Sequence, residues 1–135
     1  MIKIRKAKEI VINTVNEVGV LAEISAIVSG QGINLEALSC RVEGIKGIVH
    51  LVTDDNPRAL QALKGKNFEP FELEVVIIEL RNSAGMMKTV SAEMNKHKIN
   101  VGYLYATALK DDSKCMVVAS TSDIDRTIDV LSKLK

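Results

Sequence analysis

Aromatic side chains are scarce in this 135-residue chain, which contains no Trp, two Phe and two Tyr. RNA-binding domains of similar size need aromatics on their central strands to stack on bases. The corresponding segments here read IVHLV and CMVVAS, without an aromatic residue. An excess of one charge is also lacking, because 18 basic and 17 acidic residues give a formal net charge of +1. This balance argues against nucleic acid as a partner, since duplexes need a basic face.

Long apolar runs are missing as well. No segment approaches the ~18 consecutive apolar residues that would span a bilayer. The N-terminal segment MIKIRKA has no apolar signal-peptide core. We therefore expect a cytoplasmic protein with no membrane partner.

The sequence contains no cluster of residues typical of a metal site or a catalytic site. Cys40 and Cys115 lack a CxxC spacing, which favours small buried apolar residues in strands. His50 lies within the strand-like IVHLV, and His97 lies near a helix end. No nucleophile comes with a plausible base, and GMMKTV lacks the glycine frame of a phosphate loop. The sequence thus predicts no catalytic residue, no metal, no cofactor and no enzyme activity.

The chain contains an internal repeat. Residues 16–39 align without a gap with residues 82–105, an offset of 82 − 16 = 66 positions. The identical pairs are Asn16/Asn82, Gly19/Gly85, Ser25/Ser91, Ala26/Ala92, Ile33/Ile99, Asn34/Asn100 and Leu38/Leu104. Two repeats are too few for a solenoid, so they indicate a duplicated small domain.

Each repeat predicts the same order of elements. In the first, residues 9–15 predict a strand, 19–30 a helix, 33–42 and 47–53 two strands, and the segment after Asp55 a second helix. This is the β-α-β-β-α-β order, an α+β fold with helices on one face of an antiparallel sheet. We expect two such units side by side, the first over residues 1–73 and the second over residues 74–135.

A glycine turn precedes the first helix of each repeat, as NEVG (16–19) and NSAG (82–85). The first amides of a helix have no intrahelical partner and attract an anion such as a carboxylate. A glycine lets the backbone approach a ligand closely, and an asparagine side chain can both donate and accept. Such a turn either binds a free amino acid or only shapes the backbone.

The strand, the NxxG turn, the helix and the Gly-Ile-Asn segment after it resemble the ACT domain, a regulatory module that binds small molecules, mostly amino acids. The matching residues are Asn16, Gly19, Leu21, Gly32, Ile33 and Asn34 in the first repeat, and Asn82, Gly85, Ile99 and Asn100 in the second. Met87 replaces the expected Leu, and Lys98 replaces the expected Gly. The resemblance covers residues 8–135 and implies a free-standing tandem ACT protein of the ferredoxin-like type.

The resemblance implies a ligand between the glycine turn of one unit and the residues after the Gly-Ile-Asn segment of a neighbouring unit. The residues expected to bind it are Asn16, Glu17, Val18, Gly19, Val20, Leu21, Ile33 and Asn34, and Asn82, Ser83, Ala84, Gly85, Met86, Met87, Ile99 and Asn100. The apolar residues beside the turns suit an apolar ligand side chain. The alternatives are an adaptor that acts by protein contact without a ligand, and an RNA-binding module.

Two expectations concern assembly. The alternation in FELEVVIIEL (71–80) predicts an uncovered apolar sheet face, and therefore a homodimer or larger homo-oligomer. The second repeat has no segment for its closing strand, because its last helix runs to the end of the sequence. Residues 2–6 alternate in polarity, so they either replace that strand or form a basic tail.

Overall fold

The computed structural model describes residues 2–15, 17–81, 83–107 and 114–134. The chain divides into two compact units. The N-terminal unit is Lys8–Leu73, and the C-terminal unit combines Met1–Ala7 with Glu74–Lys135. The domain boundaries expected from the sequence placed residues 1–7 in the first domain, and the structure groups them with the second.

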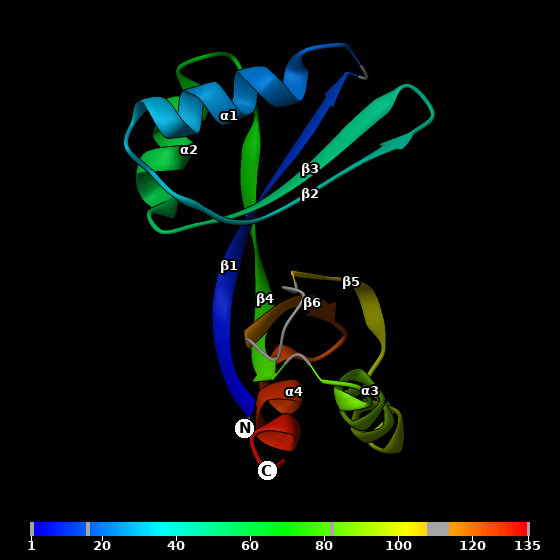
Figure 1. Ribbon diagram of the computed structural model, residues 1–135. Helices are drawn as coiled ribbons and strands as arrows, with labels where there is room; N and C mark the ends of the chain where they lie inside the picture. Colours follow the sequence, from blue (N-terminus) through cyan, green and yellow to red (C-terminus); the bar gives the residue numbers. More distant parts are fainter. Residues whose placement is uncertain (1, 16, 82, 108–113, 135) are drawn as a thin grey trace. The chain divides into compact units, whose positions relative to one another are not determined.

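The N-terminal unit contains three strands, two helices and the start of a fourth strand (Figure 1). They are β1 (Ile2–Val15), α1 (Val20–Gly30), β2 (Leu35–Glu43), β3 (Lys46–Thr53), α2 (Asn56–Lys64) and β4 (Pro70–Arg81). Within this unit the strand order is β2-β3-β1-β4. Both β1 and β2 run antiparallel to β3, with Ile10 opposite Leu51 and Leu38 opposite the same Leu51.

The C-terminal unit repeats this plan with a different starting point. The rest of β4 is followed by α3 (Met86–Lys96), β5 (Val101–Thr107), β6 (Lys114–Thr121) and α4 (Ile124–Leu131). The strand order within this unit is β1-β4-β6-β5, with β4 and β5 both antiparallel to β6. The fourth strand of this unit therefore comes from the beginning of the chain.

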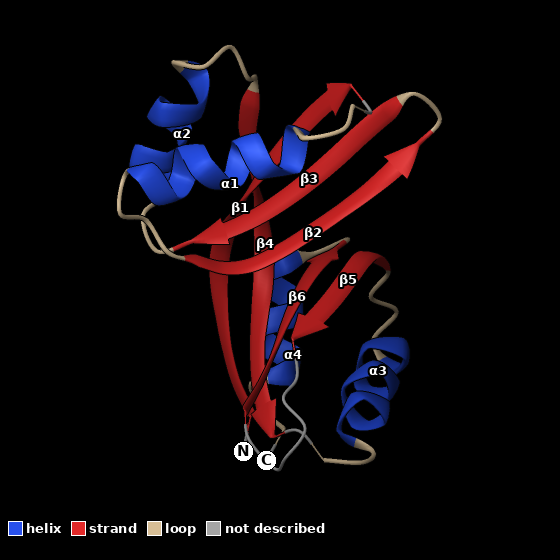
Figure 2. Cartoon of the chain, turned by 45° about the horizontal axis from the view of Figure 1, so that its top comes forward, coloured by secondary structure: helices blue, strands red, loops and turns tan. Residues whose placement is uncertain are grey.

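One helix-covered core lies in each unit. In the N-terminal unit, Ile24 of α1 and Leu63 of α2 join Ile10 of β1 and Leu51 of β3 in one buried cluster, so both helices cover the same face of the strands (Figure 2). In the C-terminal unit, α3, α4, β4 and β6 share a second cluster. The expected α+β class with two ferredoxin-like units is confirmed.

The N-terminal residues replace the missing strand of the C-terminal unit. Ile2 and Ile4 are partly buried and pack against the core cluster of that unit. Lys6 Nζ lies 2.8 Å from Asp125 Oδ1 and 3.4 Å from Glu74 Oε2. The hydrogen bond to Asp125, with the charge of that carboxylate, raises the pKa of Lys6. The strand interpretation of residues 2–6 is confirmed, and the basic-tail interpretation was wrong.

The uncovered apolar face expected on β4 is found only at the start of the strand, where Phe71 and Leu73 are 42% and 40% exposed. Val76 and Ile78 belong to the helix-covered core, while Val75 and Ile77 point to the other face. Both Val75 and Ile77 are nevertheless 0% exposed within a single chain. Four consecutive buried residues are typical of a strand covered on both faces, so this part of β4 offers no free dimer surface.

Local signals account for the helix starts. Asp55 and Asp123 precede α2 and α4, and each side chain accepts a hydrogen bond from a backbone amide of the first turn, Arg58 N and Arg126 N. Gly19 and Gly85 instead precede α1 and α3 with no side-chain cap. The two helices of each repeat therefore begin by different means, and only the aspartate type satisfies a first-turn amide with the side chain of its N-cap residue.

Candidate functional site

The two glycine turns have nearly identical backbone geometry. Gly19 has φ 91° and ψ −7°, and Gly85 has φ 88° and ψ −7°. These values lie in the left-handed region, where a side chain is strained. A Cβ at either glycine would meet no atom within 4 Å, so both turns open to solvent. Glycine is required here by conformation and leaves space directly in front of the helix.

Among the described residues, the next two amides after Val20 N and Met86 N have no backbone partner. In the first turn Val20 N reaches Glu17 O at 3.4 Å, and the first regular helical bond is Glu23 N to Gly19 O at 2.9 Å. The second turn repeats both bonds, from Met86 N to Ser83 O at 3.3 Å and from Thr89 N to Gly85 O at 3.0 Å. The amides between these bonds face the open end of the helix, where a carboxylate is favoured.

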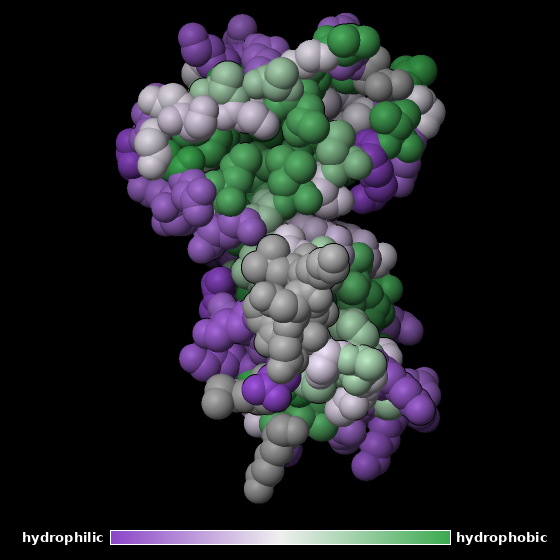
Figure 3. Space-filling view, viewed as in Figure 1, coloured by the Kyte–Doolittle hydropathy of each residue, from purple (hydrophilic) through white to green (hydrophobic). Residues whose placement is uncertain are grey.

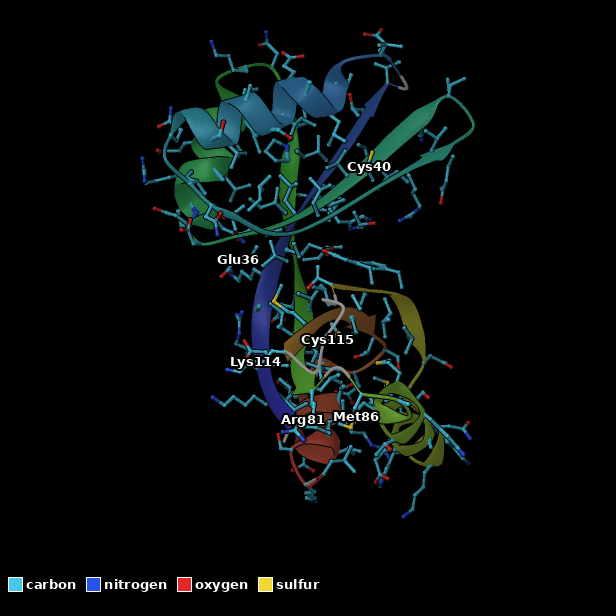
Figure 4. All side chains as sticks on the ribbon, in the orientation of Figure 1. Glu36, Cys40, Arg81, Met86, Lys114 and Cys115 are labelled. Atoms are coloured by element: carbon cyan, nitrogen blue, oxygen red, sulfur yellow. The ribbon has the colours of Figure 1, made fainter. Side chains whose placement is uncertain are left out.

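The side chains near the turns are largely exposed. Val18 is fully exposed and Leu21 is 39% exposed, while Val20 packs partly on the core. At the second turn Ser83 and Ala84 are exposed, and Met86 (labelled in Figure 4) and Met87 pack partly on their core. Asn16 and Asn82 lie outside the described residues.

The Gly-Ile-Asn segment of the first repeat and the matching Lys-Ile-Asn segment of the second bury their isoleucines. Ile33 and Ile99 are 5% and 7% exposed and belong to the two cores. Asn34 N donates to Asp54 Oδ1 at 3.0 Å, and Asn100 N donates to Ser122 Oγ at 3.1 Å. The side chains of Asn34 and Asn100 are exposed.

Each unit separates the two halves of the expected site. The glycine turn precedes α1, and Ile33 and Asn34 follow it. An α-helix of 11 residues, the length of α1, measures about 16 Å at 1.5 Å per residue. One unit therefore cannot bring Gly19 and Asn34 onto one small ligand.

An open hollow adjoins the strand that leads into the first turn. It has a volume of about 400 Å³ and is lined by residues 13–15, Lys46 and residues 67–69. Asn67, in its lining, has a positive φ of 67°. The hollow offers an ammonium from Lys46 and a carboxylate from Glu69 beside the turn.

A buried polar cluster was missed by the sequence analysis. Glu9 is 0% exposed, and its Oε1 lies 2.8 Å from Nδ1 of His50, which is also buried. On the other side of the ring, Arg41 Nη1 lies 3.1 Å from His50 Nε2. A guanidinium can only donate, so Nε2 accepts and Nδ1 carries the proton donated to Glu9. The three residues come from β1, β3 and β2, and only the strand register could have revealed them.

The remaining cysteines and histidine have simple settings. Cys115 is buried as expected, and burial raises its pKa, but Cys40 is exposed on β2. His97 ends α3, as expected, with Nε2 3.2 Å from Glu93 Oε1.

Among the described residues, no group of three or more His, Cys, Asp or Glu side chains is arranged to hold a metal ion. None of the helices in the described ranges is both long and apolar enough to cross a membrane.

Comparison with solved structures identifies the fold. Protein BT0572 from Bacteroides thetaiotaomicron has a TM-score of 0.88 and 28% identity, over 96% of this chain and 89% of that one. The regulatory subunit of aspartate kinase from Thermus thermophilus has a TM-score of 0.69 and 10% identity, over 98% and 95%. The chain has the tandem ACT-domain fold. E. coli aspartokinase III, solved with aspartate and ADP, contains this tandem ACT fold within a longer chain, with a TM-score of 0.62 and 14% identity over 98% of this chain and 33% of that one.

The tandem ACT fold is supported by the likeness to solved structures and not by a match to a sequence family. No protein-family model matches the chain, and no curated protein matches it. At identities of 10% and 14%, the likeness to the two aspartate kinase structures shows a shared fold and does not identify a ligand.

Proposed function

We propose that the chain is a regulatory protein that binds a free amino acid, or a similar small ligand, at its glycine turns. The observation that carries this proposal is the duplicated open helix start, with Gly19 and Gly85 in the same left-handed conformation and no side-chain cap. The regulatory subunit of aspartate kinase, which has the same fold, supports a regulatory role for this chain.

The turns favour a particular binding mode. The ligand carboxylate accepts hydrogen bonds from the first-turn amides of α1 or α3, where the helix dipole adds a favourable interaction. The apolar side chains beside the amides, Val18 and Leu21 or Met86 and Met87, suit an apolar ligand side chain. Binding then controls a separate enzyme or transporter, since one of the structural relatives named above is a regulatory subunit and another contains this fold within an enzyme.

A thermal screen tests the proposal. One or a few of the twenty amino acids, at millimolar concentration, should raise the melting temperature, because a ligand that binds only the folded state stabilises it. At 100 times Kd the stabilisation is about 2.7 kcal/mol. For a chain of this length that corresponds to a shift of about 8–12 °C. No shift with any amino acid would favour the alternative of an adaptor that acts without a ligand.

Matched glycine variants locate the site. Gly19→Ala and Gly85→Ala introduce the same strain, about 1–2 kcal/mol, because each places a Cβ at a left-handed residue. They differ only in which turn they obstruct. If the first turn binds the ligand, Gly19→Ala should weaken binding by about tenfold or more, an effect of ~1.4 kcal/mol, and Gly85→Ala should not. Isothermal titration of both variants measures this, and wild-type affinity in both would place the site elsewhere.

A further inference from the structure

An open groove separates the outer surfaces of the two helices of the N-terminal unit. Arg58 Nη2 donates to the carbonyl oxygen of Gln31 at 2.6 Å, so α2 begins beside the end of α1. The groove between them has a volume of about 520 Å³. Its floor is formed by Ala26, Ile27, Gly30, Ala62 and Gly65.

Two glycines keep this groove open although the backbone does not require them. Gly30 is not among the glycines with a positive φ, and a Cβ there would meet no atom within 4 Å. Gly65 has φ −66° and ψ −15°, and a Cβ there would make ordinary contacts of 3.5 Å and 3.6 Å. Glycine is less favourable in a helix than almost any other residue. What it provides at both positions is close access to the backbone.

The second repeat shows that the fold does not depend on these small, uncharged residues. Aligned by the glycine turns and by the capping aspartates, the groove positions Ile27, Gly30 and Gly65 correspond to Glu93, Lys96 and Lys133. In the C-terminal unit Glu93 lies 3.2 Å from His97, and Lys133 lies 3.6 Å from Asp129. The same surface therefore carries charged, mutually contacting side chains in one unit and is left bare in the other.

The outer face of α1 is almost uncharged along its whole length. Glu23 is the one charged residue among the 11 of this helix. The other exposed residues of α1 are Leu21, Ala22, Ala26, Ser29 and Gly30. In Figure 3 the visible face of α1 is mostly white and pale green, the colours of intermediate hydropathy. A solvated helix face normally carries charged and polar residues, so this face is typical of a helix that another element covers.

We propose that the groove between α1 and α2 docks an α-helix of a partner protein. Its lining on α1 runs from Glu23 to Gln31, and 31 − 23 = 8 residues span about 12 Å, or two helical turns. Small-molecule sites usually enclose about 70–90% of the ligand, which an open groove does not do. A helix laid along the groove gains contact on two sides. The small floor residues let it approach to the short end of the usual interaxial range of about 8–10 Å.

The charges at one end of the groove define the kind of helix that fits. Because α2 begins beside Gln31, its far end with Lys66 lies toward the first turn of α1, which contains Glu23. Within the described ranges, the ion pairs of this unit include neither Glu23 nor Lys66. The complementary helix carries a basic and an acidic residue at one end of an apolar face. Its identification with the regulated protein is the one step that rests on the proposed function.

Photo-cross-linking of the full-length chain, in the cells that produce it, tests whether such a helix docks. Ala26→benzoylphenylalanine places the reactive group in the groove, and Ala92→benzoylphenylalanine places it at the matched, equally exposed position of α3. Position 26, and not position 92, should cross-link to one protein, within a segment whose apolar residues recur at helical spacing. The proposal is overturned by no cross-link from position 26, or by one to a lipid, a nucleic acid or a segment without that spacing.

A synthetic peptide of the cross-linked segment then tests the groove with matched variants. Gly30→Lys/Gly65→Lys introduces the lysines of the second repeat, so the melting temperature should not fall, but peptide affinity should drop by about tenfold or more. The control Ala22→Lys/Ser29→Lys adds the same charge at exposed positions of α1 outside the groove and should bind like the wild type.

Two outcomes of this titration separate the groove from the proposed function. Wild-type affinity in Gly30→Lys/Gly65→Lys would overturn the docking site. A peptide that binds the wild type in the groove, with an affinity that no amino acid of the thermal screen alters, would uphold the docking site and count against the proposed regulation.

Discussion

Replacing His50 with leucine should lower the free energy of unfolding by about 3 kcal/mol. His50 Nδ1 donates to Oε1 of Glu9 at 2.8 Å, and the Glu9 carboxylate is fully buried. Leucine fills a similar volume but cannot donate, so the carboxylate loses a charge-assisted hydrogen bond in a place that water does not reach. Urea unfolding followed by circular dichroism measures the loss, with the slope checked for two-state behaviour.

A double variant separates the polar interaction from packing. If the loss arises from the Glu9–His50 hydrogen bond, Glu9→Leu/His50→Leu should recover about half of it or more, because replacing both partners with apolar residues is often nearly neutral. Arg41 is not stranded in this variant, since its Nε remains 3.1 Å from Glu43 Oε1 at a partly exposed position. A double variant less stable than His50→Leu would show that the cluster contributes mainly through shape.

Sequence patterns predicted the features that depend on near neighbours. Asp55 and Asp123 cap helices through bonds to amides three residues later, and the glycine turns lie beside the helices they begin. Such signals span a few residues, so the repeat and its element order could be read directly. The alternation of Ile2 and Ile4 predicted a strand for the same reason.

Features that depend on strand register could not be read in this way. The Glu9–His50 contact joins residues 41 positions apart, and nothing local marks either as a partner of the other. A usable signal was nevertheless overlooked in β4. Residues 75–78 are four consecutive apolar residues, which indicate burial on both faces rather than the free face inferred from alternation.

The candidate site was only partly predictable. The residue types identified Gly19 and Gly85, whose left-handed conformation the structure supplies. The side chains of Ile33 and Ile99 are in the cores, because a residue that follows a helix and precedes a strand closes the apolar layer between them. Any role of these isoleucines at a ligand would therefore go through their backbone groups.

The double variant Ile2→Ser/Ile4→Ser should lower the free energy of unfolding by about 2–4 kcal/mol. Full burial of an isoleucine is worth about 1.5–3 kcal/mol, and each of these two is partly buried against the C-terminal core. The control Lys3→Ser/Arg5→Ser changes the exposed residues of the same strand and should shift stability by less than about 0.5 kcal/mol. Differential scanning calorimetry of both variants provides the comparison.

The unfolding should begin in the C-terminal unit, since β1 supplies the fourth strand there. Hydrogen exchange should therefore show faster exchange in β6 and α4 than in β3 and α2 for the isoleucine variant. Equal losses in the two double variants would contradict a buried strand at residues 2–6.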